Sequence, residues 1–141
     1  MDHDTFEDIK LIGVDTGRVG SPRNDGTRGA SLYSVPIRLS STPPREWSDA
    51  FPDFWDRPSS YTSMHRPGIG RIEGDCVILD GTTLEEVERY HAATLKLVVA
   101  ALNTAYRKHA QERAAEDARA RAAEAEHRAS VAESAKRIRF D

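Results

Sequence analysis

Arginines gather in two loop-like stretches of this chain. In residues 15–29 they stand five residues apart among glycines, and in residues 57–71 they stand among hydroxyl side chains and His65. Guanidinium groups form paired hydrogen bonds with phosphate and carboxylate oxygens. If the two stretches fold side by side, they would make a site for a phosphate-bearing ligand or a single-stranded nucleic acid. The six arginines are Arg18, Arg23, Arg28, Arg57, Arg66 and Arg71.

A structural interpretation of the same arginines is favoured over the binding site. The loops also contain carboxylates, such as Asp15, Asp25, Asp53 and Asp56, that could pair with them. No Gly-Lys-Ser/Thr follows a predicted strand, and the glycines do not have the spacing of a dinucleotide fingerprint. Arginine makes up 16 of the 20 basic residues, a bias that a GC-rich genome alone can produce. We therefore expect mainly internal ion pairs.

Histidine and cysteine provide few candidates for catalysis. His65 and Ser63 could form a base and nucleophile, but no orienting acid accompanies them and triads assemble through space. His91 is expected at the edge of the core, bonded to a neighbour. No histidine pair has the spacing of a zinc site, so neither a metal nor a cofactor is predicted. Cys76 lies in a predicted strand and is expected to be an inert, buried thiol. We assign no catalytic residue.

A helical segment rich in aromatic residues is predicted after the strand at residues 32–39. Thr42, Pro43 and Pro44 predict its start, with Thr42 as the cap, and Pro52 predicts a kink or two short pieces. Four aromatic side chains recur at i, i+4, i+7 and i+8, so they would share one face of the helix. That face is expected in the core, or else on the surface as a partner contact. These residues are Trp47, Phe51, Phe54 and Trp55.

Four strands are predicted. Two cover residues 9–14 and 32–39, and Pro36 in the second predicts an edge strand or a bulge, because proline lacks the backbone donor. A hairpin follows, with its two-residue turn at Gly74 and Asp75. In that register Ile72, Val77 and Leu79 share one apolar face, and Gly70 leaves room beside Leu79. The sheet is therefore expected to be small and mostly antiparallel.

One long helix is predicted from Thr83 to about Arg139. Thr83 and Glu86 have the spacing of a capping box, in which Thr83 accepts from a backbone amide and Glu86 reaches back. Apolar residues follow at helical spacing as far as Ala105 and would cover the sheet. The predicted fold is therefore α+β: a small, mostly antiparallel sheet covered by a long C-terminal helix that extends beyond the domain.

The character of this helix changes after Tyr106. From Arg107 to Ser130 it carries no Val, Ile, Leu, Met or aromatic residue. It could be a solvated helix that frays beyond about residue 110, a self-associating helix, or a docking element for another protein. Its alanine stripe contains Ala110, Ala114, Ala118, Ala122, Ala125, Ala129 and Ala132. Apolar bulk returns only at Val131, Ile138 and Phe140, the second candidate surface for a partner.

Length and charge narrow the class of protein. The 141 residues fit one compact domain, predicted at residues 1–106, with a helical extension at 107–141. These segments hold 11 basic against 16 acidic residues and 9 against 7, without the basic excess of a duplex nucleic-acid binder. No apolar run approaches the ~20 residues of a membrane span. The acidic Met1–Asp4 is unlike a signal peptide. One cysteine indicates the cytoplasm.

These features predict a non-catalytic interaction or accessory protein. It would self-associate or dock on another protein through its extended C-terminal helix. The alternative is a binding domain for nucleic acid or a phosphate-bearing ligand, built from the two arginine-rich loops. Nucleic acid is the less favoured partner, and no membrane partner is expected.

Overall fold

The computed structural model describes residues 6–141. The acidic Met1–Asp4 lies outside this range. The chain divides into two compact units, whose described residues are Glu7–Tyr106 in the first and Phe6 with Arg107–Asp141 in the second. All four strands belong to the first unit, and the second is helical as far as Lys136.

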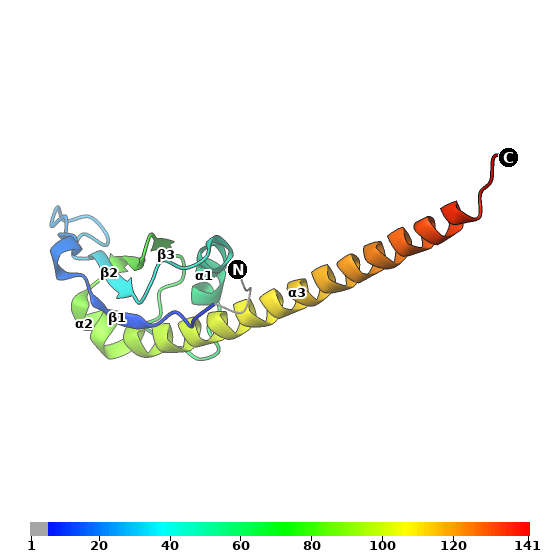
Figure 1. Cartoon of the computed structure of the whole chain (residues 1–141). Coiled ribbons are helices and arrows are strands. Elements are labelled where there is room, and N and C mark those ends of the chain that lie inside the picture. Colours follow the sequence, from blue (N-terminus) through cyan, green and yellow to red (C-terminus); the bar gives the residue numbers. More distant parts are fainter. Residues whose placement is uncertain (1–5) are drawn as a thin grey trace. The chain divides into compact units, whose positions relative to one another are not determined.

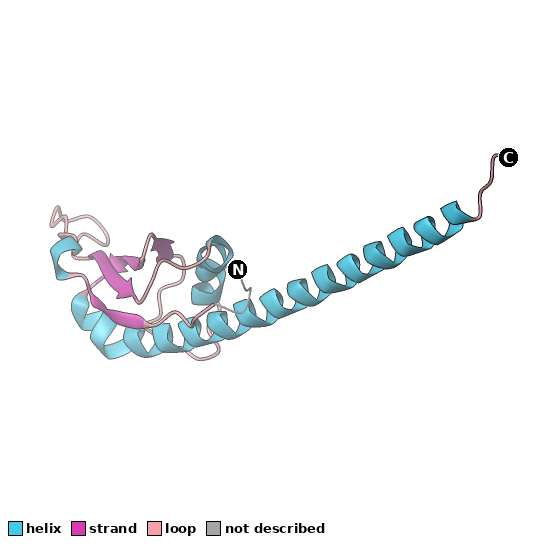
Figure 2. Cartoon of the chain, viewed as in Figure 1, coloured by secondary structure: helices cyan, strands magenta, loops and turns pink. Residues whose placement is uncertain are grey.

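The first unit contains a four-stranded antiparallel sheet (Figures 1 and 2). The strands are β1 (Leu11–Val14), β2 (Tyr33–Leu39), β3 (Gly70–Glu73) and β4 (Cys76–Thr82), and their order in the sheet is β1-β2-β4-β3. Together with the helices this confirms the α+β class. Strand β2 begins one residue later than predicted, and β1 covers only the end of the predicted first strand. Ile9, which precedes β1, is nevertheless buried.

The β3–β4 hairpin has the predicted register. Glu73 pairs with Cys76 and Gly70 with Leu79, and Gly74 in the turn has a φ of 60°. Gly70 makes room for a different neighbour than expected. A Cβ atom there would lie 2.8 Å from Cγ of Trp55, so the missing side chain allows helix α1 (Arg45–Asp56) to pack against β3. The hairpin and the aromatic helix are therefore joined at a glycine.

Of the two alternatives predicted for the strand with Pro36, the edge strand is wrong, because β2 is paired on both sides. The register of β2 with β4 does shift, between Tyr33 and Ser34, which lie before the proline. The Pro36 carbonyl accepts a hydrogen bond from the amide of Asp15, one residue beyond the end of β1. The Asp15 carbonyl, which would face the missing proline donor in an antiparallel pair, instead accepts from the amide of Arg18. Since β1 has ended there, the central strand accommodates proline without an unpaired acceptor.

Helix α1 differs from its prediction at both proline features. It begins after Pro44, with no side-chain cap, so Thr42 is not the cap. It also continues through Pro52 as one helix to Asp56, without the expected division into two pieces. Trp47, Phe51 and Trp55 are completely buried. The aromatic face thus lies in the core of the first unit.

The long helix is continuous but not uniform. It consists of α2 (Leu84–Glu86), a π turn η3 (Val87–His91) and α3 (Ala92–Lys136). Thr83 caps it as predicted, its hydroxyl accepting from the amide of Glu86 at 3.1 Å. The second half of the capping box is replaced by another contact, because the Glu86 carboxylate is bound by Arg66 and Thr82. The buried residues of α3 are Thr94, Leu95, Val98, Val99, Leu102 and Asn103.

Asn103 ties three parts of the first unit together. Its Oδ1 accepts from the backbone amide of Ile9 at 3.1 Å and from Nε1 of Trp47 at 3.0 Å. Its Nδ2 donates to the carbonyl of Ile9 at 2.8 Å. The Asn103 side chain is buried, so water cannot replace a hydrogen-bond partner that is lost there. One amide therefore holds the segment before β1 and helix α1 against α3.

We predict that Asn103→Ala lowers the free energy of unfolding by about 3 kcal/mol, because it removes three buried hydrogen bonds and leaves their partners unpaired. Urea unfolding of the full chain measures this loss. The control is Thr104→Ala, which removes only an exposed bond to the carbonyl of Ala100 and should cost less than about 0.5 kcal/mol. Equal losses in the two variants would show that the Asn103 amide has no special role.

Candidate functional site

The first arginine-rich stretch is closed by its own contacts. Arg23 donates to the carbonyl of Arg28 at 3.0 Å and to the hydroxyl of Thr27, and it pairs with Asp25 at 3.8 Å. Asp25 accepts from the amide and hydroxyl of Thr27, which lower its pKa. Arg28 itself is exposed. This loop thus organises itself around a carboxylate and not around an anion-binding cleft.

Two further arginines lie on the sheet face that is opposite the aromatic helix. Arg18 approaches Sγ of Cys76 at 3.7 Å. Arg71 lies between two carboxylates, 2.6 Å from Glu73 and 3.1 Å from Asp80. Cys76 and Glu73 are register partners, which places Arg18 and Arg71 on the same face. Carboxylates thus pair with Arg71, whereas the contact of Arg18 is with a thiol.

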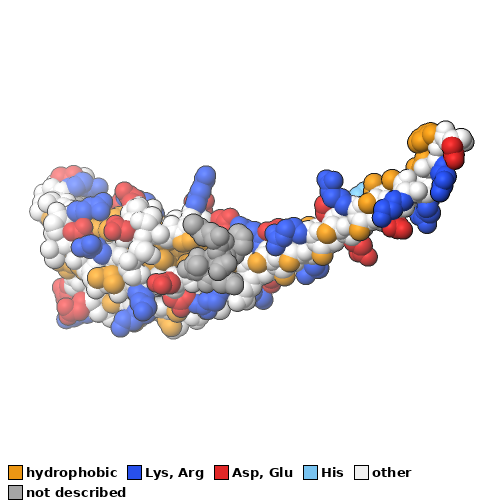
Figure 3. All heavy atoms as spheres, viewed as in Figure 1, with side chains coloured by type: hydrophobic (Ala, Val, Ile, Leu, Met, Phe, Trp, Pro, Cys, Tyr) orange, Lys and Arg blue, Asp and Glu red, His pale blue; other side chains and the backbone are white. Residues whose placement is uncertain are grey.

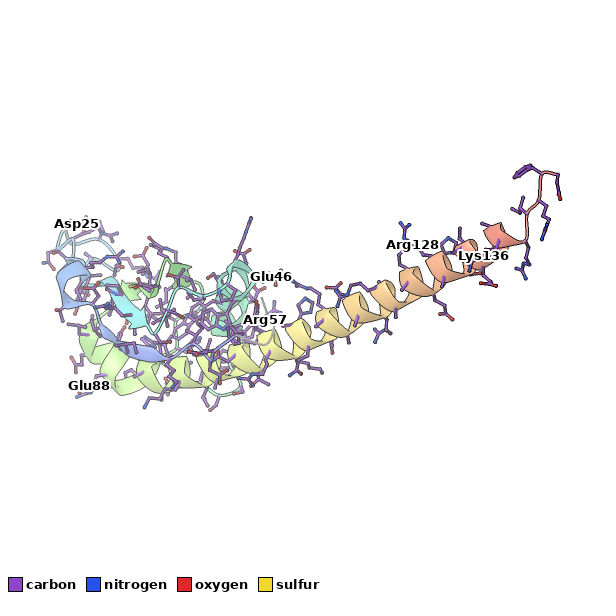
Figure 4. The ribbon with its side chains drawn as sticks, viewed as in Figure 1. Asp25, Glu46, Arg57, Glu88, Arg128 and Lys136 are labelled. Atoms are coloured by element: carbon purple, nitrogen blue, oxygen red, sulfur yellow. The ribbon has the colours of Figure 1, made fainter. Side chains whose placement is uncertain are left out.

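Arg66 belongs to a different environment. Its Nε and one terminal nitrogen bind the two oxygens of Glu86 at 2.9 and 2.8 Å, the paired geometry that guanidinium and carboxylate prefer. Arg57, in the same stretch, is exposed (Figure 4). The six predicted arginines therefore do not form one site, although Arg18 and Arg71 share a sheet face, and four of the six contact side chains within their own domain.

The most unusual arrangement of polar groups surrounds His91. We call it the His91 cluster: His91, Glu86, Arg66, His65, Thr82 and Trp55. Thr82 donates its hydroxyl to Oε1 of Glu86 at 2.7 Å, while Nε2 of His91 lies 3.9 Å from the same oxygen, too far for a hydrogen bond. His91 is completely buried. Neither of its ring nitrogens has a hydrogen-bond partner among the described residues.

The two titratable groups in this cluster shift in ways that keep His91 neutral. The paired hydrogen bonds from Arg66 lower the pKa of Glu86, so the carboxylate stays charged well into acid. Burial lowers the pKa of His91, although the Glu86 carboxylate opposes this effect. An uncharged imidazole is thus enclosed beside an ion pair that is already complete.

His65 is fixed in one tautomer. Its Nε2 lies 2.8 Å from the carbonyl of Trp55 and must carry the proton, because a carbonyl can only accept. Its Nδ1 is buried and has no partner in the described part of the chain. The ring packs on the indole of Trp55 with centroids 4.4 Å apart. His65 is therefore a packing residue over Trp55, with no bond to Ser63 as a nucleophile.

Other candidate groups for chemistry are enclosed or scattered. Burial raises the pKa of Cys76, which disfavours the reactive thiolate. Within residues 6–141, no three His, Cys, Asp or Glu side chains come together as metal ligands do. No helix in that range has an apolar stretch sufficient for a membrane crossing.

Of the two predicted partner surfaces, the aromatic one is largely buried and the C-terminal one is exposed. Trp47, Phe51 and Trp55 expose no surface and Phe54 is half-buried, so they offer a partner little to contact. Val131, Ile138 and Phe140 are exposed by 52%, 62% and 96%. The second unit as a whole is helical to Lys136, and every residue from 115 onward is exposed. Figure 3 shows small apolar side chains along it, interspersed with charges of both signs.

No protein-family model matches this chain, and neither a curated protein nor a solved structure is significantly similar to it.

The His91 cluster could not be recognised from spacing. Glu86 and His91 are five residues apart, which in an ideal α-helix puts them about 140° apart around the axis. The π turn at Val87–His91 widens that part of the helix and brings both residues toward the same site. We expected His91 to be bonded to a neighbour, which the structure contradicts. The signal available in the sequence was a histidine within an apolar helical stripe.

We predict that Arg66 and Glu86 are coupled by about 1–2 kcal/mol at pH 7, since the pair is partly buried and doubly hydrogen-bonded. A double-mutant cycle with Arg66→Met and Glu86→Gln, read by urea unfolding, measures this coupling. Because the pKa of Glu86 is lowered in the folded state, the stabilisation is present above its ordinary value of 4.5 and is lost as the pH falls below it.

The matched control is the exposed pair Arg45 and Asp49, 3.7 Å apart on α1. Its cycle, with Arg45→Met and Asp49→Asn, should give less than about 0.5 kcal/mol. A coupling between Arg66 and Glu86 that is no larger than this would contradict the prediction.

Proposed function

We propose that this protein is a non-catalytic accessory protein that self-associates through the C-terminal part of α3. The observation that carries this proposal is a helix that continues to Lys136 although no residue in it after Asn103 is buried. Helix-forming residues alone can maintain such a segment, because alanine, arginine and glutamate have high helix propensity. A segment that remains helical without burying side chains presents its whole surface for association.

A coiled-coil seam is formed by Ala115 together with the alanine stripe from Ala118 onward, without Ala110 and Ala114. From Ala115 the alanines recur at alternating intervals of three and four residues, which are the a and d positions of a heptad repeat. Alanine at both positions lets two helices approach closely but buries little apolar area. The resulting association is expected to be weak. The seam residues are Ala115, Ala118, Ala122, Ala125, Ala129 and Ala132.

Charges beside the seam support a second copy of the same chain, in parallel orientation. In this register Arg121 and Arg128 occupy g positions, and Glu126 and Glu133 occupy e positions. A parallel pair brings each g residue near the e residue five positions later in the other helix. Both arginines then face a glutamate, and Ala114 faces Arg119. An antiparallel pair would instead place the arginine flanks together.

The charged flanks are exposed and make only surface ion pairs within their own helix. Arg128 (labelled in Figure 4) pairs with Glu124 at 3.0 Å, and Glu133 pairs with Lys136 at 3.9 Å. Exposed pairs of this kind contribute little, so their members can exchange partners on association. The nucleic-acid alternative has less support, because Arg18, Arg23, Arg66 and Arg71 already contact groups within their own domain.

We predict that Ala122→Asp abolishes self-association of the full chain, because it puts a carboxylate into the seam on both helices. Sedimentation equilibrium over roughly micromolar to millimolar concentrations, which brackets a weak Kd, measures the mass. The matched control, Ala120→Asp, makes the same chemical change at an f position on the opposite face and should leave the association intact.

Two results would contradict the proposal. The unmodified chain could remain a monomer over the whole concentration range, or both aspartate variants could weaken association equally. Circular dichroism of each variant checks that the helix content is unchanged, since both substitutions lower helix propensity by a similar amount.

A further inference from the structure

Residues 57–69, between α1 and β3, close over His91. Hydrogen bonds to α1 and to α2 fasten this segment. Nε1 of Trp55 donates to the carbonyl of Arg66 at 2.9 Å, and Nε2 of His65 donates back to the carbonyl of Trp55. Arg66 binds Glu86 on the long helix, and the amide of Gly68 donates to Asp56 at 2.7 Å. Hydrogen bonds thus join the segment to α1 at Trp55 and Asp56 and to α2 at Glu86.

The surroundings of His91 disfavour a positive charge on its ring. Its ring lies edge-on to Trp55, with centroids 5.6 Å apart, and 6.4 Å from the ring of His65. The titratable and charged groups that face it are Glu86, Arg66 and His65. Glu86, the only anion among them, is already held by Arg66 and Thr82. A proton on His91 would therefore create a buried imidazolium close to the guanidinium of Arg66. This imidazolium would have no carboxylate partner of its own.

We propose that residues 57–69 are a latch that opens when His91 takes up a proton. Outward movement of this segment exposes the imidazole to water and removes the guanidinium of Arg66 from its side. The strand ladders and the Asn103 contacts do not involve residues 57–69 and remain in place. The latch is joined to β4 by a bond from the amide of Asp80 to the carbonyl of Ile69, which lies at the end of the segment next to β3. Opening is therefore local, and it occurs below the pH at which a free histidine titrates.

Linkage sets the size of the effect. The closed state holds His91 neutral, whereas in the open state it titrates near its ordinary value of 6.5. The open state therefore binds more protons as the pH falls, so closure is complete above this pH and weakens below it. For one proton, the opening equilibrium constant rises about tenfold between pH 7.5 and pH 5.5 when the closed state stays unprotonated.

The two tryptophans provide a reporter and an internal control. Nε1–H of Trp55 donates to Arg66 in the latch, and Nε1–H of Trp47 donates to Asn103 in the core. Both indoles are completely buried, and the chain has no other tryptophan. Hydrogen exchange of the two indole protons, followed by NMR on the full chain, reports opening at each place. Their ratio cancels the intrinsic effect of pH on exchange.

We expect the ratio of the Trp55 to the Trp47 exchange rate to rise about tenfold from pH 7.5 to pH 5.5. In His91→Gln and His91→Leu, which cannot take up the proton, the ratio should not change with pH. The result must also agree with the ring signals of unmodified His91, which should not titrate while the latch is closed.

Three results would overturn the latch. The two indoles could exchange faster together, which indicates global unfolding. The ratio could rise in the His91 variants but not in His65→Gln, which assigns the proton to His65. Finally, the ring of His91 could titrate near pH 6.5 with no change in the ratio, which would show that the closed protein accommodates the charge.

Discussion

Asn103 is the last buried residue of α3, and it is also the residue that holds the segment before β1 and α1 against that helix. The last buried contact of α3 is therefore a set of directional hydrogen bonds. These fix the rotation of α3 about its own axis more strictly than apolar packing does. No residue of the helix beyond Asn103 is buried. The same covalent element therefore serves two purposes, first as a packed component of the fold and then as an exposed surface.

The two parts of the helix depend on different sources of stability. Residues from Val87 to Asn103 stay helical because large side chains are buried, including Leu95, Val98 and Leu102. The later part relies on intrinsic propensity and on ion pairs within the helix, such as Glu124 with Arg128. Such a segment needs no partner to be helical. Self-association is therefore proposed from its small seam and charged flanks, and not from any need to bury apolar surface.

Local features of the sequence were sufficient for much of the fold. The turn at Gly74 set the hairpin register, and the hydroxyl of Thr83 marked the start of the long helix. The errors came from contacts that form only in three dimensions. Pro36 is tolerated in a central strand because β1 ends opposite it. The Glu86 carboxylate does not complete the capping box because it binds Arg66, which lies in another segment of the chain. The His91 cluster was missed for the same reason, together with a π turn that helical periodicity does not anticipate.

Disulfide trapping tests the parallel seam most directly. In a chain with Cys76→Ser, Ala125→Cys puts one thiol at a d position, where a parallel pair in register brings identical residues together. We expect rapid oxidation to a covalent dimer, and no comparable product from Ala120→Cys on the opposite face. Equal dimer yields from the two positions, or no dimer from Ala125→Cys at concentrations where the chain associates, would contradict it.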